Sequence, residues 1–299
     1  MPLGSSEGQV AVDGGNVWYR IVGDAEAPPV IVLHGGPGFP SDYLETLEWL
    51  AVDRRVVFYD QLGCGRSPAP QHLDLLRIDR FIRELQQIRS ALNLDTVHVF
   101  GHSWGSMLAT DYLLTQPAGV LSVVLASPVL SITRYRADVD RLRMELPPDV
   151  QEELLRHESD GTTRGDEYQR LCQTFYSKHI CRLERWPDSM MRALDQSSDF
   201  VYERMWGPSE MLVTGILARY EREPRLGEIK IPVLLTCGRF DEATPEASRS
   251  FQKLFPNARL AVFENSAHMP HLEESEAYLA TCREFFGQVD RDAGIMPVS

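Results

Sequence analysis

The sequence predicts an α/β protein whose doubly wound, mostly parallel sheet is interrupted by a helical insertion. Short apolar runs alternate with helical patterns over residues 10–128, and the same alternation returns at 227–299. The stretch between them has no strand-like aliphatic run. Because such alternation builds parallel sheets covered by helices on both faces, we expect one core domain made of residues 1–128 and 227–299. Residues 129–226 are expected to form a helical cap domain inserted between late strands.

The first half of the chain begins with strand patterns. Residues 16–23 alternate between apolar and polar positions, as in an antiparallel strand, whereas 29–36 and 54–60 are continuous apolar runs typical of strands buried on both faces. Residues 77–92 carry a regular apolar stripe and predict a helix. The other elements expected in this half are helices at 41–52 and 104–116 and strands at 96–103 and 121–127.

The strand and helix pattern resumes after the insertion. Residues 231–238 and 258–265 are strand-like, and residues 274–287 predict a final helix. A further helix is expected to begin after Thr244, because threonine is a good N-cap and Pro245 suits the first helical position.

Composition narrows the possible functions. The formal charge of −13 argues against a nucleic-acid partner, and no apolar run is long enough to predict a membrane span. The five cysteines are odd in number and include no C-x-x-C pair, which argues against disulfides and zinc sites and favours a reducing, cytoplasmic location. The first ten residues lack the features of a signal peptide. No metal or cofactor is expected, and the oligomeric state stays open.

The stretch FGHSWGSMLA places Ser103 where a predicted strand ends and a predicted helix begins. This is the context that the G-x-S-x-G motif of serine hydrolases requires. Gly101 and Gly105 leave room for the sharp turn that would expose the serine hydroxyl. A serine needs a base to act as a nucleophile, and on this type of sheet its partners are expected at the ends of later strands.

Asp241 and His268 follow the last two predicted strands, which places them at the same edge of the sheet as Ser103. The order Ser, Asp, His is the one used on this type of sheet. We therefore expect Ser103 as nucleophile, His268 as base and Asp241 as the acid that orients the histidine.

Other residues could in principle replace these partners. His271 lies three positions after His268 and is expected at the start of the last helix. His102 should point away from the serine, and His98 is expected in the core. Asp60 precedes the nucleophile in sequence, and the stretch YDQLGCGRS around it is better explained as a structural turn.

Two backbone amides should stabilise the oxyanion that forms when the serine attacks a carbonyl. The amide of Trp104 directly follows the nucleophile. The second should come from the turn HGGPG, with Gly36 as the first choice and Gly35 as its neighbour. A phosphate-binding loop is excluded because neither G-K-[ST] nor G-x-G-x-x-G occurs, and Pro37 lacks an amide donor.

The motifs HGGPG, YDQLGCGRS, GHSWGS, MWGPSE and GRFDEATP together resemble those of the proline iminopeptidase family. The resemblance extends from about residue 34 to 286 and implies an α/β-hydrolase fold with a helical cap. It also implies a serine aminopeptidase or amidase that releases one N-terminal residue. One departure is His102, where many members of the family have glycine.

The same resemblance assigns substrate-binding residues. It implies that Glu210 and Glu242 bind the free α-amino group of the substrate, which agrees with the ability of paired carboxylates to hold an ammonium. Composition alone would suggest that Glu210 and Glu242 are ordinary solvated charges among the 43 acidic residues. The resemblance further places an aromatic pocket for a compact ring between Phe39, Trp104 and Trp206.

We therefore expect a serine hydrolase that releases an N-terminal proline, or a small residue such as alanine, from peptides or aminoacyl amides through an acyl-enzyme. The substrate partner is then a small molecule or peptide with a free N-terminal amine. One alternative is an amidase that removes an amino-acyl group from a biosynthetic intermediate. A second is a carboxylesterase, which would not need paired glutamates, and a third is a non-catalytic binding protein on the same fold.

Overall fold

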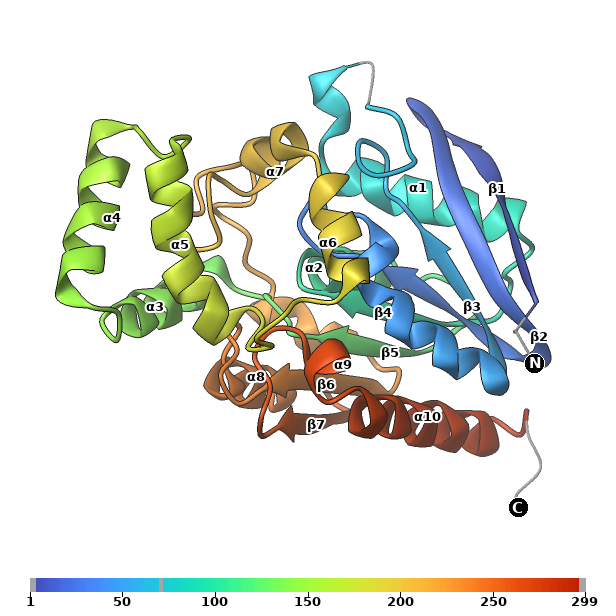
Figure 1. Ribbon diagram of the computed structural model, residues 1–299. Coiled ribbons are helices and arrows are strands. Elements are labelled where there is room, and N and C mark those ends of the chain that lie inside the picture. The colour runs from blue at the N-terminus through green and yellow to red at the C-terminus, as the bar shows by residue number, and fades with distance from the viewer. Residues whose placement is uncertain (1–3, 70–71, 296–299) are drawn as a thin grey trace.

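A seven-stranded sheet forms the centre of the molecule (Figure 1). The computed structural model describes residues 4–69 and 72–295. The strand order is β1-β2-β4-β5-β6-β7, and β3 pairs with β2. The pairs of β2 with β1 and β3 are antiparallel, whereas the four pairs from β2 to β7 are parallel. The strands are β1 (Ser5–Val12), β2 (Gly15–Leu33), β3 (Arg54–Tyr59), β4 (Val97–His102), β5 (Val120–Ala126), β6 (Val233–Gly238) and β7 (Ala258–Phe263).

Strand β2 combines two strands that the sequence analysis treated as separate. Residues 16–23 and 29–36 were expected as individual strands, but the extended backbone continues from Gly15 to Leu33. The register of β2 against β3 shifts between Val22 and Val30. This irregularity lets one strand serve both the antiparallel part of the sheet and its parallel part.

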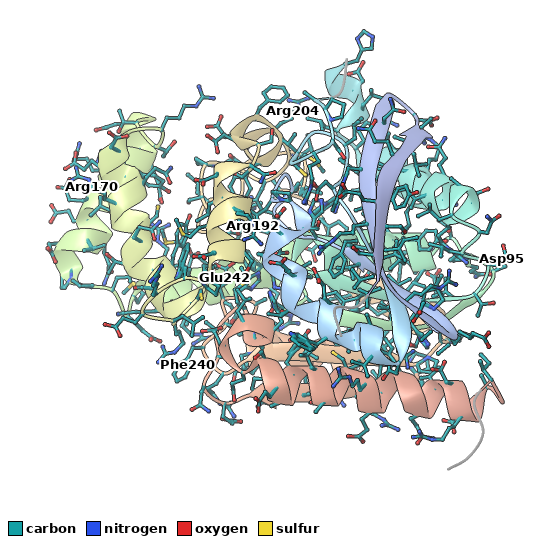
Figure 2. All side chains as sticks on the ribbon, turned by 45° about the vertical axis from the view of Figure 1, so that its right-hand side comes forward. Asp95, Arg170, Arg192, Arg204, Phe240 and Glu242 are labelled. Atoms are coloured by element: carbon teal, nitrogen blue, oxygen red, sulfur yellow. The ribbon has the colours of Figure 1, made fainter. Side chains whose placement is uncertain are left out.

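Helices cover both faces of the sheet, as the sequence predicts. On one face α1 (Ile78–Ala91), α2 (Trp104–Leu113) and α8 (Pro245–Gln252) contribute to an apolar cluster that includes Leu33 of β2. On the other face, η1 (Ser41–Val52) and α10 (Ser275–Asp292) pack on a second cluster that includes Val32. Alternate residues of β2 therefore enter opposite clusters. Figure 2 shows side chains filling the space between the sheet and these helices.

The stretch between β5 and β6 is helical, and Figure 1 shows α3, α4 and α5 to one side of the sheet. Its helices are α3 (Ile132–Arg143), α4 (Pro148–Asp160), α5 (Asp166–His179), α6 (Asp188–Asp195) and α7 (Asp199–Met205). Apolar residues of α3, α4, α5 and α7 belong to the same apolar cluster as those of α1 and α2. The division into a core domain (1–128 and 227–299) and a cap domain (129–226) stays a prediction.

Several local expectations can be compared with the structure. The helix expected at 77–92 is α1, and Thr244 caps α8 by accepting a hydrogen bond from Ala247 N at 3.1 Å. The helix expected at 41–52 is a 3-10 helix, η1. The remaining short elements are η2 (Leu73–Leu75), η3 (Glu223–Glu228) and α9 (Pro270–Glu273).

Candidate active site

Ser103 lies at a sharp turn between β4 and α2. Its φ of 53° and ψ of −118° are unusual for a residue with a side chain, and this conformation exposes the hydroxyl at the carboxyl end of the strand. The flanking glycines are required by close backbone contacts. A Cβ at Gly105 would lie 2.1 Å from Leu33 O, and one at Gly101 would lie 2.3 Å from Gly105 O. Gly101 therefore allows the turn to close on itself, and Gly105 allows it to pack against the end of β2.

His268 and Asp241 meet on the loops that follow β7 and β6. His268 Nδ1 donates a hydrogen bond of 2.7 Å to Asp241 Oδ1, which also accepts one from Ala243 N at 2.8 Å. With its Nδ1 proton used in this way, the neutral ring has Nε2 free as an acceptor. A Cβ at Gly238 would lie 2.1 Å from Ala267 O, so this glycine allows the two loops to approach.

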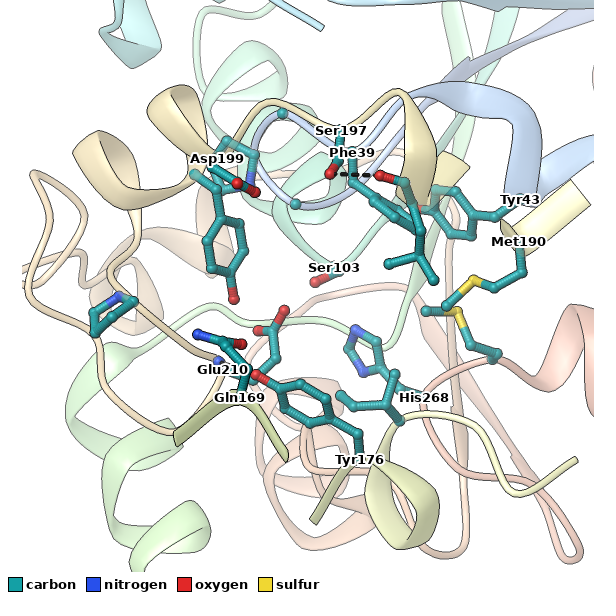
Figure 3. A pocket seen from close by; sticks show the side chains of 18 of the residues that line it. Phe39, Tyr43, Ser103, Gln169, Tyr176, Met190, Ser197, Asp199, Glu210 and His268 are labelled. Carbon is teal, nitrogen blue, oxygen red and sulfur yellow. Dashed lines mark hydrogen bonds between the residues drawn. The ribbon is translucent and has the colours of Figure 1, made fainter. Parts of the chain in front are cut away.

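The charge state of His268 is set by opposing effects. Burial alone would lower the pKa of His268, but the carboxylates of Asp241 and Glu210 outweigh it and raise that pKa above its ordinary value. The ring is almost completely buried. Ser103 and His268 line the same cavity, where Figure 3 shows both side chains directed inward.

Of the two expected oxyanion donors, Trp104 directly follows Ser103 and Gly36 lines the same cavity as Ser103. The amides of Gly36 and Trp104 have no hydrogen-bond acceptor within the described ranges, whereas Gly35 N donates to the Tyr43 hydroxyl at 2.8 Å. This difference favours Gly36 over Gly35. Gly36 has a φ of +100°, and a Cβ there would lie 2.7 Å from Phe39 N, so the turn requires glycine.

Gln61 joins the two segments that carry these amides, a role that no motif in the sequence predicts. Its side-chain amide donates to His34 O at 3.1 Å, and its oxygen accepts from the Trp104 indole at 2.8 Å. Its main-chain amide donates to His34 Nε2 at 2.8 Å. The stretch YDQLGCGRS is thus a structural turn that holds the candidate oxyanion site together.

Glu210 and Glu242 are close neighbours, the first half-buried and the second buried. Glu210 lines the cavity, where Figure 3 shows its carboxylate below Ser103. Glu242 is buried and does not line the cavity, and its Oε2 has no hydrogen-bond partner among the described residues. Burial, followed by the negative charges of Glu210 and Asp241, raises the pKa of Glu242 well above its usual range. Burial also raises the pKa of Glu210, although the His268 charge and the Tyr202 hydroxyl oppose this effect.

Tyrosines surround Glu210, and no motif in the sequence pointed to them. The Tyr135 hydroxyl donates to Glu210 O at 3.0 Å, and Glu210 N donates to the Tyr176 hydroxyl at 3.3 Å. Tyr176 and Tyr202 also line the cavity. These phenols come from three different helices of the insertion, so only the tertiary structure brings them together.

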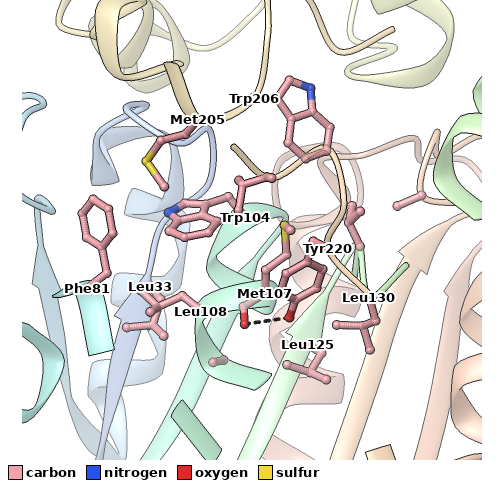
Figure 4. Packing of buried hydrophobic residues seen from close by; sticks show 14 of the residues in the cluster. Leu33, Phe81, Trp104, Met107, Leu108, Leu125, Leu130, Met205, Trp206 and Tyr220 are labelled. Atoms are coloured by element: carbon pink, nitrogen blue, oxygen red, sulfur yellow. Dashed lines mark hydrogen bonds between the residues drawn. The ribbon is translucent and has the colours of Figure 1, made fainter. Parts of the chain in front are cut away.

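The aromatic pocket expected from the resemblance is found only in part. Phe39 lines the cavity, but the side chains of Trp104 and Trp206 are buried in the apolar cluster (Figure 4). The Trp104 ring packs edge-on against Phe81 at 5.7 Å, and the Trp206 ring packs against Tyr135 at 5.2 Å. Trp206 is therefore not a wall of this cavity.

The competing residues have other partners. Asp60 accepts hydrogen bonds from Arg66 Nε at 2.7 Å and from Ser41 N at 3.0 Å, as expected for a structural turn. His98 bonds to Ser122 and Asp290 in the core, and His271 Nε2 lies 3.2 Å from Tyr43 O.

One group of described residues has the arrangement of possible metal ligands, namely Glu153, His157 and Glu167. The guanidinium of Arg156 lies among them, 2.6 Å from Glu153 Oε2 and 3.2 Å from His157 Nε2. This resident cation already balances the acidic charge. All five cysteines are free and buried. Among the described residues, no helix has the length and apolar character needed to cross a membrane.

The cavity has a volume of about 530 Å³, within the usual range for small-molecule sites. On one side of Ser103 it is polar and includes Glu210, Gln169 and Asp199, whereas Met190 lies on the other side in the view of Figure 3. The apolar lining includes Phe39, Ile180, Trp186, Met190, Leu194 and Met269.

Comparisons with known proteins show the fold family and the relatives of this chain. Residues 28–275 match the model of the alpha/beta hydrolase fold family. The chain is 46% identical over 286 residues to the proline iminopeptidase of Heyndrickxia coagulans, covering 95% of this chain and 99% of that protein.

Two solved structures are similar to this chain along almost its whole length. The crystal structure of VinJ is 37% identical with a TM-score of 0.92, covering 95% of this chain and 99% of VinJ. The structure of the Mycobacterium smegmatis proline iminopeptidase is 32% identical with a TM-score of 0.89, covering 96% of this chain and all of that one.

Proposed function

Because the chain belongs to the proline iminopeptidase family of α/β-hydrolases, we propose that it is a serine aminopeptidase that releases proline, or a small residue such as alanine, from the amino end of peptides or aminoacyl amides. The observation that carries this proposal is the position of the half-buried Glu210 in the same cavity as Ser103 and His268. A carboxylate so placed can bind an ammonium at a fixed distance from the scissile carbonyl.

In the proposed reaction the Ser103 hydroxyl attacks the carbonyl carbon of the first residue. His268 Nε2 accepts the hydroxyl proton, and Asp241 stabilises the resulting imidazolium through the bond to Nδ1. The amides of Gly36 and Trp104 stabilise the oxyanion. His268 then returns the proton to the leaving amine, and the acyl group stays on Ser103. Water attacks this ester by the reverse steps and releases the amino acid.

Glu210 and Glu242 select the substrate in this proposal. The empty pair retains a proton on Glu242, because two buried carboxylates repel each other when both are ionised. An entering ammonium supplies the positive charge that allows both to ionise. A substrate with a blocked amine lacks this charge and leaves the buried acidic groups without a partner.

The apolar lining supports a second candidate activity, removal of an amino-acyl group from a larger molecule. With the amine held at Glu210, the leaving group extends away from it, toward the side of Met190. The lining of the cavity includes aromatic, aliphatic and thioether groups, which bind an apolar amine better than a charged peptide.

A substrate panel tests these proposals. We expect prolyl and alanyl p-nitroanilides with free amines to be cleaved and their N-acetyl forms to be inert. Comparison of prolyl peptides with prolyl amides of long alkyl amines separates the peptidase from the second candidate. Equal cleavage of free and acetylated substrates would instead support a carboxylesterase or a general serine hydrolase. Failure of an active-serine phosphonate to label the protein would support a non-catalytic binding protein.

A further inference from the structure

His102, the residue before Ser103, takes part in a chain of buried hydrogen bonds. We propose that His102 is a positioning residue that holds the main chain of His268 against the turn that carries the nucleophile. This inference rests on the proposed function, because it assigns His268 as the base. His102 Nε2 lies 2.8 Å from His268 O, and His102 Nδ1 lies 2.8 Å from the Tyr43 hydroxyl.

The direction of each hydrogen bond follows from the chemistry of the groups. A carbonyl oxygen only accepts, so His102 Nε2 must carry the proton that it shares with His268 O. In the neutral ring Nδ1 is then an acceptor, and the Tyr43 hydroxyl must donate to it. The Tyr43 oxygen in turn accepts from Gly35 N at 2.8 Å. Every proton in this chain has one consistent position.

Burial keeps the chain in this state. The side chains of Tyr43 and His102 are almost fully inaccessible. Burial, together with the nearby rings of His268 and His271, keeps the pKa of His102 well below its usual value, so the ring is neutral. Water cannot easily replace a lost partner at such a depth, so each bond matters to the geometry.

The chain connects three parts of the candidate site. It begins at Gly35, beside the oxyanion donor Gly36, passes the residue next to Ser103 and ends at the backbone of His268. The Ser127 hydroxyl donates to the same carbonyl at 3.1 Å. His102 and Ser103 are adjacent in one rigid turn, so the position of this ring sets the distance from the nucleophile to its base.

Three substitutions of His102 separate the two hydrogen bonds. His102→Phe removes both. His102→Gln places an amide donor the same number of bonds from Cα as Nε2, so it can still donate to His268 O. His102→Asn places its oxygen at the level of Nδ1, so it can accept from Tyr43 but cannot reach the carbonyl.

We expect kcat to fall about 10- to 100-fold in His102→Phe and His102→Asn, because a misplacement of about 1 Å can cost ~10²-fold. His102→Gln should restore kcat to within a few-fold of wild type, and KM should change little in all three. A rise in KM with unchanged kcat would show instead that His102 acts as a pocket wall and would overturn the proposal. Equal kcat in the Gln and Asn variants would overturn it as well.

The rate of labelling by an active-serine phosphonate provides a readout that does not depend on the substrate. After correction for the folded fraction, we expect His102→Gln to be labelled faster than His102→Asn and His102→Phe. Unlabelled wild-type protein would contradict the proposed function itself. Labelled wild type together with equally fast labelling of the Phe and Asn variants would contradict only the role of His102.

Two further variants keep the test decisive if His102→Phe does not fold. His98→Gln is a matched control, because His98 is a buried histidine of the same strand that bonds to Ser122 and Asp290 instead. It should lower Tm without slowing the labelling of folded protein. Tyr43→Phe removes one hydroxyl from the chain and should reduce kcat less than His102→Phe. In the double variant the two losses should not add, because both residues belong to one network.

Discussion

Replacement of Glu210 by glutamine should show whether the cavity recognises an amine. The substitution keeps the shape of the side chain and removes its charge. Glu210 is half-buried beside Glu242 and Tyr202, so solvent would screen its interaction with a bound ammonium only in part. The loss of a buried charge-assisted bond should cost about 2–4 kcal/mol. Since about 1.4 kcal/mol corresponds to tenfold, kcat/KM should fall roughly thirty- to several-hundred-fold.

The assay compares two substrates with the same enzyme preparations. Prolyl p-nitroanilide has the free amine, and p-nitrophenyl acetate does not. We expect Glu210→Gln to lose activity on the first and to retain most of it on the second. Glu203→Gln is the control, because Glu203 also lines the cavity but is paired with Arg164 and partly exposed. It should stay within about twofold of wild type, as surface ion pairs contribute little.

Two outcomes would refute the reasoning about Glu210. An equal loss on both substrates would mean that the substitution disturbs Ser103 or His268 and not the binding of an amine. Full activity on the anilide would mean that the ammonium lies elsewhere.

The remaining predictions concern the catalytic residues and their protons. Ser103→Ala should lose at least about three orders of magnitude in kcat and stay folded; near-normal turnover by a clean preparation would remove Ser103 as the nucleophile. Asp241→Asn should lower kcat by a comparable factor, because an amide at this position would favour the wrong tautomer of the His268 imidazole. A larger loss of kcat in Asp60→Asn would instead identify Asp60 as the acid that orients the histidine. The base must be neutral to act, so kcat/KM should rise with pH through a pKa above 6.5, the ordinary value for His268; a flat profile from about pH 5 to 9 would contradict this. Binding of a free-amine inhibitor at neutral pH should release a proton from Glu242, which calorimetry in buffers of different ionisation enthalpy would detect as a buffer-dependent heat.

Local motifs explain which parts of the candidate site could be predicted. The positions of Ser103, Asp241 and His268 depend on strand ends, and strand ends are visible as apolar runs followed by turn residues. The G-x-S-x-G spacing is predictive because Gly101 and Gly105 touch backbone atoms that any Cβ would displace. Parallel strands bring such ends to one edge of the sheet, so distant residues meet without further information.

Other features depend on side-chain directions that no motif encodes. Trp206 was placed in the pocket by the resemblance, but its ring packs on Tyr135 inside the apolar cluster. The link from Tyr43 to His102 joins residues far apart in sequence and depends on the rotamers of both. The continuity of β2 was missed because its middle, 24–28, is polar and proline-containing, which is typical of a loop.

The groups that would break the bond and one of the two groups that would choose the substrate come from different stretches of the chain. Ser103, Asp241 and His268 follow β4, β6 and β7, whereas Glu210 arrives from the stretch inserted between β5 and β6. Because Glu242 directly follows Asp241, only the part of the selectivity that depends on Glu210 can change independently of the reaction centre during evolution. A mutant library confined to 129–226 would explore new substrates on an unchanged reaction centre, and a selection for altered leaving groups should begin there.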